Sequence, residues 1–461
     1  MNIIFRSIWI TLIGSITWSG EAQNAFTLEE AVQYGLQNSN QIKLNQLNLQ
    51  DADAQLMDYK SIGYPKLNGS IDFTHYFAIP STVIPDFLSP VVDGRLVHYK
   101  ILDKNQVEAP PAGGFPAKFG QANSLSAGVG LNTIVYDPAF FLGLKASKLY
   151  KDLVTRQNSV TDITIRQSVA KAYLGALISI KSKDIIDQNI KTLDKITKET
   201  QIIQSKGFVE QIDVDRLLLS LNSLQTEAEK VSRMTEITLN VLKLQMGYPM
   251  DQPIQLKDKI DELVNTLKVD NMDLVAPFKP DQRPEYRYMQ LADELNKIRM
   301  QSIKLGAYPS INGFANASYG TQTNNIFSKS SFWFPTALAG FKVNVPIFDG
   351  FSRKAKYQRA SIETDKLHLQ MNDFERAMNL EVSSSRIAFE NAKSTLESTK
   401  RNLELAQKIY DQAQAKFKGG IGSSLEINQA ETALIQQQGS YVNALYSLLV
   451  AKTDLDKALG K

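Results

Sequence analysis

Residues 339–345 have the sequence Ala339-Gly340-Phe341-Lys342-Val343-Asn344-Val345, directly before Pro346, the last proline of the chain. Apolar residues at 341, 343 and 345 alternate with polar residues at 342 and 344, a period of two that predicts a β-strand with one apolar face. The following 115 residues contain no proline, and proline breaks a helix interior at about 3 kcal/mol. A strand that leads into a long helical segment is therefore the predicted unit of this fold.

A second long segment without proline covers residues 139–248. Both proline-free segments are rich in Leu, Ile, Ala, Gln, Glu and Lys, and their apolar residues recur three or four positions apart, as in helices. Each is interrupted near its middle by glycine, at Gly207 and at Gly419-Gly420. Glycine just past a helix end commonly stops the helix and reverses the chain. We therefore predict two helical hairpins with helices of up to some 65 residues, which at ~1.5 Å per residue approach 100 Å.

The chain also contains an internal repeat. Tyr64-Pro65-Lys66-Leu67-Asn68-Gly69 reappears as Tyr308-Pro309-Ser310-Ile311-Asn312-Gly313, and the strand ends at 135–137 and 347–349 are 212 positions apart, as are the hairpin glycines Gly207 and Gly419. Further alternating segments at 67–73, 125–132 and 311–319 predict four strands in all. The pattern indicates two copies of strand–loop–strand–helix–tip–helix, the first with a longer proline-rich loop at 78–122.

Composition excludes several classes of function. Lys plus Arg (51) nearly balance Asp plus Glu (48), which argues against a nucleic-acid partner. The chain has no cysteine, and its three histidines, His75, His98 and His368, are not at ligand spacing, so we expect no metal site and no cofactor. The glycines of Gly128-x-Gly130 follow no βα unit and suit a strand better than a nucleotide loop. The sequence predicts a protein that is not an enzyme.

Residues 1–22 predict a secretory signal peptide. Arg6 supplies the positive charge, 8–17 the short apolar stretch, and Gly20-Glu21-Ala22 the small-x-small cleavage site. No later stretch is long and apolar enough to span a bilayer as a helix. We therefore expect an exported protein that enters a membrane, if at all, as strands.

Four strands cannot close a membrane barrel, because the smallest such barrels have eight and an open edge in lipid leaves backbone groups unpaired. The fold class predicted is a mixed α and β membrane protein in which three copies share a 12-stranded β-barrel continued by a long α-helical tunnel. An aromatic girdle at the lipid interface is predicted at Phe332, Trp333 and Phe334. The alternative is a secreted structural or adhesive coiled-coil protein with a small soluble β-sheet.

The predicted segments are a signal peptide (1–22), N-terminal periplasmic helices (23–64), a first β-hairpin with its long loop (65–137), a first helical hairpin with its tip near 207–213 (138–248), a connector (249–284), a helix (285–308), a second β-hairpin (309–349), and a second helical hairpin with its tip near 419–426 (350–461).

The chain resembles the TolC family of outer-membrane exit ducts of Gram-negative efflux and type I secretion systems. The resemblance is carried by Phe26-Thr27-Leu28-Glu29-Glu30-Ala31-Val32, by both Tyr-Pro strand entries, by Pro346-Ile347-Phe348-Asp349-Gly350, by the tip segment 419–428 and by the closing segment 454–460. It implies a homotrimer with a pore through the outer membrane and a tunnel across the periplasm. It also implies a periplasmic adaptor and an inner-membrane RND or ABC-type transporter as partners, because the chain has no site for an energy source.

The resemblance further implies a gate at the periplasmic end of the tunnel. The acidic ring of the gate corresponds to Asp213, Glu426 and Gln429, although an acidic residue is expected at position 429. The aromatic residue and the arginine that hold the gate closed in the family correspond to Phe417 and Gly422. The acids also suit the positive ends of helix dipoles, so a merely solvated helix N-terminus stays an alternative. The adaptor would dock at the hairpin tips, on Gly207, Phe208, Val209, Gly419, Gly420 and Ile421. The sequence does not indicate the cargo, or whether loop 78–122 caps or plugs the pore.

Overall fold

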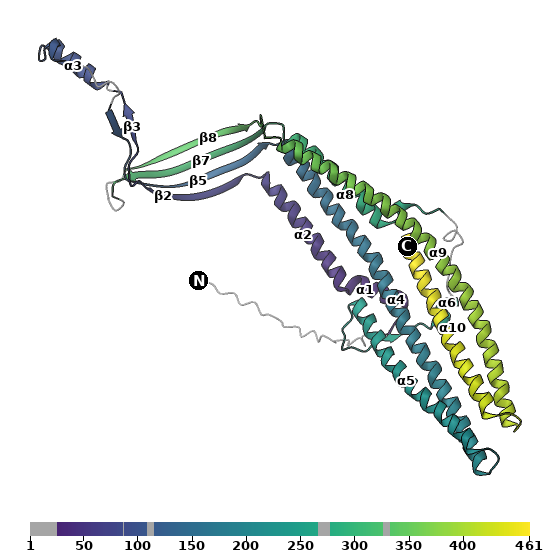
Figure 1. The fold of residues 1–461 in the computed structure, drawn as a ribbon. Helices are drawn as coiled ribbons and strands as arrows, with labels where there is room; N and C mark the ends of the chain where they lie inside the picture. Colours follow the sequence, from purple (N-terminus) through teal and green to yellow (C-terminus); the bar gives the residue numbers. More distant parts are fainter. Residues whose placement is uncertain (1–24, 86, 108–114, 266–276, 326–331) are drawn as a thin grey trace, which may run out of the picture. The chain divides into compact units, whose positions relative to one another are not determined.

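The structure is a computed structural model that describes residues 25–85, 87–107, 115–265, 277–325 and 332–461 (Figure 1). The predicted signal peptide lies outside the described residues. The chain divides into two compact units. The helical unit contains Leu149–Leu295, Glu363–Lys461 and the described residues up to Asp53, and the sheet unit contains Ala54–Lys148 and Asn296–Ile362.

The strands are β1 (Ala25–Phe26), β2 (Lys66–His75), β3 (Ser81–Ile84), β4 (Phe115–Lys118), β5 (Asn123–Tyr136), β6 (Gln255–Leu256), β7 (Ser310–Thr323) and β8 (Trp333–Asn344). The helices are α1 (Leu28–Asn38), α2 (Asn40–Ile62), α3 (Leu88–His98), α4 (Pro138–Ser205), α5 (Gln211–Met246), α6 (Ile260–Asn265), α8 (Pro284–Leu305), α9 (Ser352–Lys418) and α10 (Ser424–Leu459), with short 3-10 turns η1 (Lys104–Gln106) and η2 (Pro280–Gln282). In the part of the chain that the structure describes, no helix combines the length and hydropathy needed to cross a membrane.

Two helical hairpins occupy the proline-free segments. Helices α4 and α5 contain 68 and 36 residues, and α9 and α10 contain 67 and 36. Both tips lie at the predicted glycines, Gly207 and Gly419-Gly420, which come past the middle of each segment, so the first helix of each hairpin is longer than the second. Gly207 and Gly247 both have positive φ and end α4 and α5, so the spacing of these glycines sets the short second helix.

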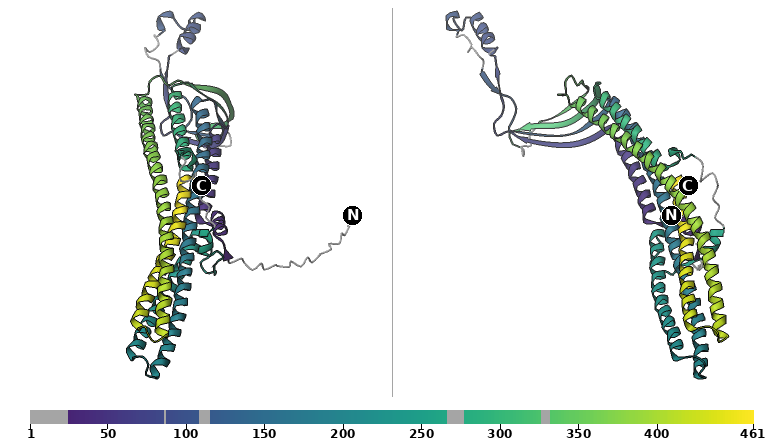
Figure 2. Two further views of the ribbon diagram at one scale, coloured as in Figure 1. Left: turned by 90° about the vertical axis from the view of Figure 1, so that its right-hand side faces the viewer. Right: turned by 45° about the vertical axis from the view of Figure 1, so that its right-hand side comes forward.

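The helical unit has its core where the two hairpins meet, and Figure 2 shows the hairpins running alongside each other. Toward the tips, Leu193 of α4, Leu217 of α5 and Ile427 of α10 are fully buried together with the largely buried Tyr410 of α9. A second cluster surrounds Tyr173 of α4, whose hydroxyl donates to the carbonyl of Phe26 at 2.9 Å. Burial of such side chains contributes about 1.5–3 kcal/mol each and is the main stabilising term of this unit.

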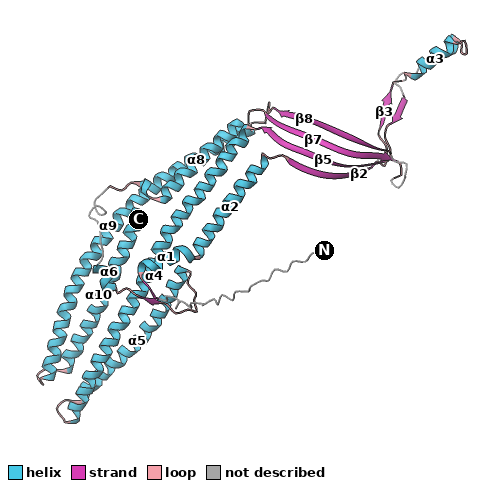
Figure 3. Cartoon of the chain, turned by 180° about the vertical axis from the view of Figure 1, so that it is seen from behind, coloured by secondary structure: helices cyan, strands magenta, loops and turns pink. Residues whose placement is uncertain are grey.

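The sheet unit contains a four-stranded antiparallel sheet in the order β2-β5-β7-β8 (Figure 3). The four alternating segments found in the sequence lie in these strands, with β8 ending at Asn344. The long first loop contains the separate two-stranded pair β3–β4 and the helix α3. None of the large apolar side chains of these four described strands is buried, so the sheet has no core of its own within one chain.

Candidate functional site

The pairing register gives the sheet two chemically different faces. Directly opposed residues share a face, and odd-numbered residues oppose odd-numbered residues at every pair of strands outside the bulge at Ile134 and Tyr136. The odd face contains Leu67, Gly69, Ile71, Phe73, His75, Asn123, Leu125, Ala127, Val129, Leu131, Thr133, Ile311, Gly313, Ala315, Ala317, Tyr319, Thr321, Thr323, Trp333, Pro335, Ala337, Ala339, Phe341 and Val343. The even face contains Lys66, Asn68, Ser70, Asp72, Thr74, Ser124, Ser126, Gly128, Gly130, Asn132, Ser310, Asn312, Phe314, Asn316, Ser318, Gly320, Gln322, Phe334, Thr336, Leu338, Gly340, Lys342 and Asn344.

The odd face is mainly apolar, carries no Asp, Glu, Lys or Arg, and exposes most of its large side chains to solvent. Its polar residues are Thr133, Thr321 and, at the end of the strands that carries Trp333, His75, Asn123 and Thr323. Ile71 is 79% exposed and Phe341 is 74% exposed, although both lie in the middle part of their strands. Exposing a side chain of this kind costs about 1.5–3 kcal/mol relative to burial, and a continuous apolar patch on this scale marks an interaction surface. The even face instead consists mainly of Asn, Ser, Thr and Gly, with only three large apolar residues, Phe314, Phe334 and Leu338, and suits contact with water. The odd face therefore needs an apolar partner that the described residues do not supply.

Both outer strands of this sheet have an open edge among the described residues. Strand β2 pairs there only with β5, and strand β8 pairs only with β7. Unpaired backbone N–H and C=O groups along an edge strand are a template for pairing with another strand. The sheet is thus incomplete at both edges as well as on its apolar face.

Aromatic residues lie near one end of the apolar face. Trp333 and Tyr319 both belong to it, and their rings are stacked with centroids 5.7 Å apart. Of the other predicted girdle residues, Phe334 opposes Gly320 and lies on the even face, and Phe332 precedes β8 and is exposed. Strand alternation prevents two successive residues from sharing a face, so only Trp333 of the predicted triplet lies on the apolar face within a strand.

A second group of exposed aromatic residues lies at the opposite ends of the strands, where they meet the helices. Its members are Tyr64, Tyr136, Phe141, Tyr308, Phe348 and Phe351. Sequence reasoning missed this group because its members come from four separate segments and only strand pairing brings the segments together. A signal was present, since Tyr64 and Tyr308 are the first residues of the repeated Tyr-Pro motif.

The two aromatic groups are separated by a distance suited to a bilayer. Tyr308 and Tyr319 are 11 residues apart, which corresponds to ~36 Å along a strand at ~3.3 Å per residue. A strand tilt of roughly 40° would reduce this to about 28 Å, close to the ~25 Å height of the apolar band of outer-membrane barrels.

The residues predicted to dock an adaptor all lie in the two turns at the hairpin tips. Gly207 and Gly420 have φ of 81° and 74°, a conformation that favours glycine over any residue with a side chain. Phe208 and Ile421 are 80% and 83% exposed, whereas Val209 is half-buried. Each tip therefore presents one large apolar side chain to solvent beside a turn that requires glycine.

One of the predicted gate residues, Asp213, belongs to a set of hydrogen bonds that join the two tips within one chain. The Ser424 hydroxyl of α10 donates to the Asp213 carboxylate of α5. Arg216 donates to the Ser424 hydroxyl at 3.3 Å and lies 3.7 Å from the Asp213 carboxylate. One turn further along, Asn428 donates to Ser220 at 2.7 Å. Asp213 is thus held against the other hairpin, and Ser424, which sequence reasoning missed, is its partner.

Glu426 is exposed and Gln429 follows it on the next turn of α10. The backbone N–H of Glu426 donates to the Ser423 hydroxyl at 3.3 Å, which caps this helix, and the position suits an acid because it lies at the positive end of the helix dipole. Both the gate interpretation and the solvated helix N-terminus are compatible with this geometry.

Phe417 is half-buried and packs against the apolar core near the tips. A Cβ atom at Gly422 would lie 2.8 Å from the Phe417 nitrogen and 2.9 Å from the Lys416 Cβ. A side chain at position 422 would therefore clash with the turn, so the compact turn itself requires glycine where the family resemblance leads us to expect a locking arginine.

One acidic side chain is buried among the helices near the tips. Glu431 of α10 is only 5% exposed, and burial raises its pKa to about 7. Burial, together with the nearby carboxylates of Glu431 and Asp411, raises the pKa of Tyr410 to about 12. Glu431 therefore titrates near neutral pH inside the helical unit.

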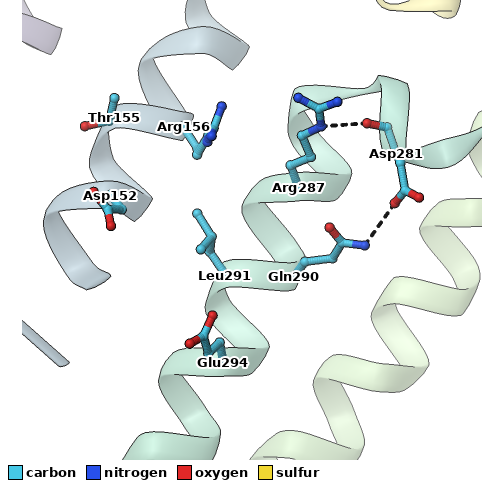
Figure 4. A pocket seen from close by; sticks show the side chains of 8 residues that line it. All are labelled: Asp152, Thr155, Arg156, Asp281, Arg287, Gln290, Leu291 and Glu294. Atoms are coloured by element: carbon cyan, nitrogen blue, oxygen red, sulfur yellow. Dashed lines mark hydrogen bonds between the residues drawn. The ribbon is translucent and has the colours of Figure 1, made fainter. Parts of the chain in front are cut away.

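A polar groove of about 870 Å³ lies between α4 and α8 in the helical unit (Figure 4). Arg287 donates to the Asp281 carbonyl at 2.6 Å, and Gln290 donates to its carboxylate at 2.9 Å. The groove is lined by Asp152, Thr155, Arg156, Asp281, Arg287, Gln290, Leu291 and Glu294. It contains none of the predicted site residues. Across the described residues, no group of three or more His, Asp or Glu side chains is placed to hold a metal ion.

The C-terminal part of the chain, residues 300–461, matches the family model described as outer membrane efflux protein. The probable efflux pump outer membrane protein TtgC of Pseudomonas putida is 24% identical over 312 residues, 65% of this chain. Nodulation protein T of Rhizobium leguminosarum bv. trifolii is 21% identical over 297 residues, 63% of this chain. These matches span 61% and 62% of the two relatives, less than two thirds of their length.

Solved structures share the fold over nearly the whole chain. The Campylobacter jejuni CmeC outer membrane channel has a TM-score of 0.69 at 15% identity, with 100% of this chain and 93% of that chain covered. CusC, whose structures describe folding and transmembrane channel formation, has a TM-score of 0.70 at 16% identity, with 94% and 92% covered.

The family model and the relatives agree with the resemblance predicted from the sequence, and that prediction is confirmed. They also confirm that the chain is not an enzyme, because the matched family consists of efflux proteins, and they argue against the alternative of a secreted adhesive protein. Residues 300–461 of the chain therefore match the family of outer membrane efflux proteins, and these similarities agree with the predicted location in the outer membrane.

Proposed function

We propose that the protein is the exit duct of a tripartite efflux or type I secretion system: a homotrimeric, passive, gated channel through the outer membrane. The single observation that carries the proposal is the sheet with one continuous apolar face and two open edges among the described residues. Three copies would join these edges into a closed 12-stranded barrel, with the apolar face toward lipid and the Asn-, Ser- and Thr-rich face toward the lumen.

The helical unit supports the same assembly. Large apolar side chains on α9 are exposed in a stripe with helical spacing, namely Leu369, Leu380, Ile387, Leu405 and Ile409. Such a stripe is expected to pack against a further helix, and a second copy provides one. The near-equal lengths of α4 and α9, and of α5 and α10, support an internal repeat, so three chains would form a tunnel of two similar hairpins per copy.

The assembly can be tested by disulfides between copies, because the chain has no cysteine of its own. Ile71→Cys on β2 is combined in turn with Ala337→Cys, Ala339→Cys or Phe341→Cys on β8. If β8 of one copy pairs with β2 of the next, one of these combinations oxidises to linked dimers and trimers, because directly opposed Cβ atoms lie about 4.5–5.5 Å apart.

Two controls accompany this experiment. Ile71→Cys alone should form no link, and its combination with Leu338→Cys should form none because Leu338 lies on the opposite face. A monodisperse monomer in detergent extracts, with no link from any combination, would refute the proposed duct.

The periplasmic gate is proposed at the tips, around Asp213, Glu426, Gln429 and Phe417. Three-fold symmetry would bring three copies of Glu426 together at one constriction and favour cations there. The hydrogen bond between Ser424 and Asp213 would tie the two hairpins of each copy together in the closed state. This contact would take over part of the locking role that Gly422 cannot perform.

The gate can be tested with the double variant Asp213→Ala/Glu426→Ala in planar bilayers. We expect a larger conductance, a several-fold lower preference for cations and weaker block by multivalent cations, because a charged ring and a link between hairpins are both removed. Asp215→Ala is the matched control, since Asp215 lies on the same turn of α5 but accepts from Gln211 and does not contact Ser424. Unchanged cation preference and unchanged block in the double variant would discard the gate.

The partners proposed are a periplasmic adaptor and an inner-membrane RND or ABC-type transporter. The exposed Phe208 and Ile421 beside the glycine turns provide apolar anchors of the kind that insert into a groove between a partner's helices. The transporter would supply the energy and choose the cargo, either drugs and other small molecules or proteins.

A further inference from the structure

The first loop of the sheet unit carries a structured element, whereas β7 and β8 are joined by residues 324–332 alone. After β2 ends at His75, the chain forms β3, α3 and β4 before it returns to the sheet at Asn123. Strands β3 and β4 pair antiparallel from Ser81–Lys118 to Ile84–Phe115, and α3 lies between them along the chain. We call β3, α3 and β4 the outer excursion.

The outer excursion exposes apolar side chains on its helix and beside it. Val92 of α3 is 51% exposed, and no residue of α3 is buried. Exposed apolar residues of the outer excursion and its flanks include Val83, Phe87, Val91, Val92 and Tyr99. An 11-residue helix with these side chains in water is marginal by itself, because most helical stability in proteins comes from packing of an apolar face. The outer excursion therefore lacks, among the described residues, the partner against which it would pack.

The lengths of the strands argue against membrane lipid as the partner of the outer excursion. Strands β5 and β7 have 14 residues each, about 46 Å along the strand and roughly 35 Å in height at a tilt of about 40°, which already exceeds the ~25 Å apolar band. The outer excursion begins beyond the strand ends that carry Trp333 and the nearby Tyr319, so it would lie outside the hydrocarbon region. Its apolar side chains would face water unless they meet one another.

We propose that the outer excursions of three copies pack together by their α3 helices and cap the outer mouth of the pore. This inference rests on the proposed trimeric barrel, which would place three identical outer excursions around one rim. A 12-stranded barrel with strands ~4.8 Å apart and tilted by about 40° has a radius of about 12 Å. Strand β3 and helix α3 together reach roughly 30 Å, so each outer excursion can reach the axis.

Charge does not oppose this packing. Within α3, Asp93 and Arg95 are the only residues of the types Asp, Glu, Lys and Arg, and they carry opposite charges. Three copies of a neutral helix can approach without net repulsion. The cap is thus an interface between copies of this chain, separate from the β2 and β8 edges that would close the barrel.

The cap can be tested with single cysteines in the full-length protein, extracted as the assembled complex. Val92→Cys should oxidise to disulfide-linked dimers, one per trimer with the third cysteine left free, and oxidation should lower the pore conductance until a reductant is added. Val91→Cys, at the neighbouring exposed position of α3, tests whether a missing disulfide at residue 92 reflects only the geometry of that one position. Ile71→Cys is the matched control, because it is similarly exposed in one chain but lies on the apolar face that points away from the axis in a barrel.

The outcomes separate the cap from the duct. Dimers from Val92→Cys or Val91→Cys, with none from Ile71→Cys, support the cap. If disulfides between β2 and β8 link the copies into trimers but cysteines at 91 or 92 form none, the proposed cap is refuted and the proposed duct is retained. Strong quenching by lipid-borne quenchers of a fluorophore attached to the thiol of the Val92→Cys variant also overturns the cap, because it assigns the outer excursion to the membrane surface. Absence of any trimer overturns both proposals.

Discussion

Replacing Arg283 with Ala should lower the free energy of unfolding of the helical unit by about 3 kcal/mol. The Arg283 side chain is only 4% exposed. Its guanidinium donates to Glu285 at 2.8 and 3.0 Å, to Glu381 of α9 at 2.9 Å and to the carbonyl of Ala458 at 3.1 Å. Removing it leaves two carboxylates without their cation and one carbonyl without a donor, which costs more than the lost attraction alone.

The size of this effect depends on burial of the partners. Glu285 is 20% exposed and Glu381 is 38% exposed, so Glu381 can recover part of its hydration and the loss falls at the lower end of the range for buried pairs. Urea unfolding of the detergent-solubilised protein, followed by circular dichroism of the helices, measures the change.

An exposed ion pair on α9 supplies the matched control. Arg376 lies 3.8 Å from Asp373, and both side chains are at least 80% exposed. Arg376→Ala should change stability by less than about 1 kcal/mol, because solvent screens such pairs. Equal losses for Arg283→Ala and Arg376→Ala would show that the buried pairs do not hold the connector to the second hairpin.

Replacing Glu431 with Gln should stabilise the protein at pH 8 and flatten its dependence on pH. The pKa of Glu431 is about 7 in the folded state against an ordinary value of 4.5, because burial disfavours the charged form. Between these two values the folded state binds more protons than the unfolded state, so stability is highest at low pH and falls as the pH rises toward 7. The loss at pH 8 is about 3 kcal/mol.

Glutamine has nearly the shape of protonated glutamate and cannot ionise. Glu431→Gln should therefore exceed the parent protein in stability at pH 8 by up to about 3 kcal/mol and match it below pH 5. Melting of the helical signal at pH 5 and at pH 8 measures the difference. Glu404→Gln on α9, where the side chain is exposed, should show no such difference. A Glu431→Gln variant with the pH dependence of the parent would mean that Glu431 is not titrating inside the fold.

Local patterns were sufficient for the four strands of the sheet and for the long helices, but not for β3, α3 and β4, which lie in what the sequence predicted only as a proline-rich loop. Alternation over 67–73, 125–132, 311–319 and 339–345 marked the strands, because a sheet with one apolar face repeats every two residues. The absence of proline marked the helical segments, and Gly207 and Gly420 marked the tips, because only glycine adopts their positive φ without strain. These signals are properties of short stretches and need no knowledge of the rest of the chain.

Contacts between distant segments were not predictable in the same way. Ser424 could not be identified as the partner of Asp213, which is 211 positions away, nor could Glu381 as the partner of Arg283. The buried state of Glu431 was equally hidden, since charged residues recur throughout the same helix. Burial and pairing depend on which helix faces meet, and similar amphipathic patterns on four helices allow several arrangements.

The amino-acid order alone therefore specified strands, helices, turns and the repeat, because each follows from backbone preferences and from the period of apolar residues over a few positions. Three-dimensional packing assigned Phe334 and Trp333 to opposite faces, gathered the second aromatic group at the helical ends of the strands and left two edges of the described sheet open. These features arise from register and from contact across hundreds of residues, where the free energy of one segment depends on the position of another.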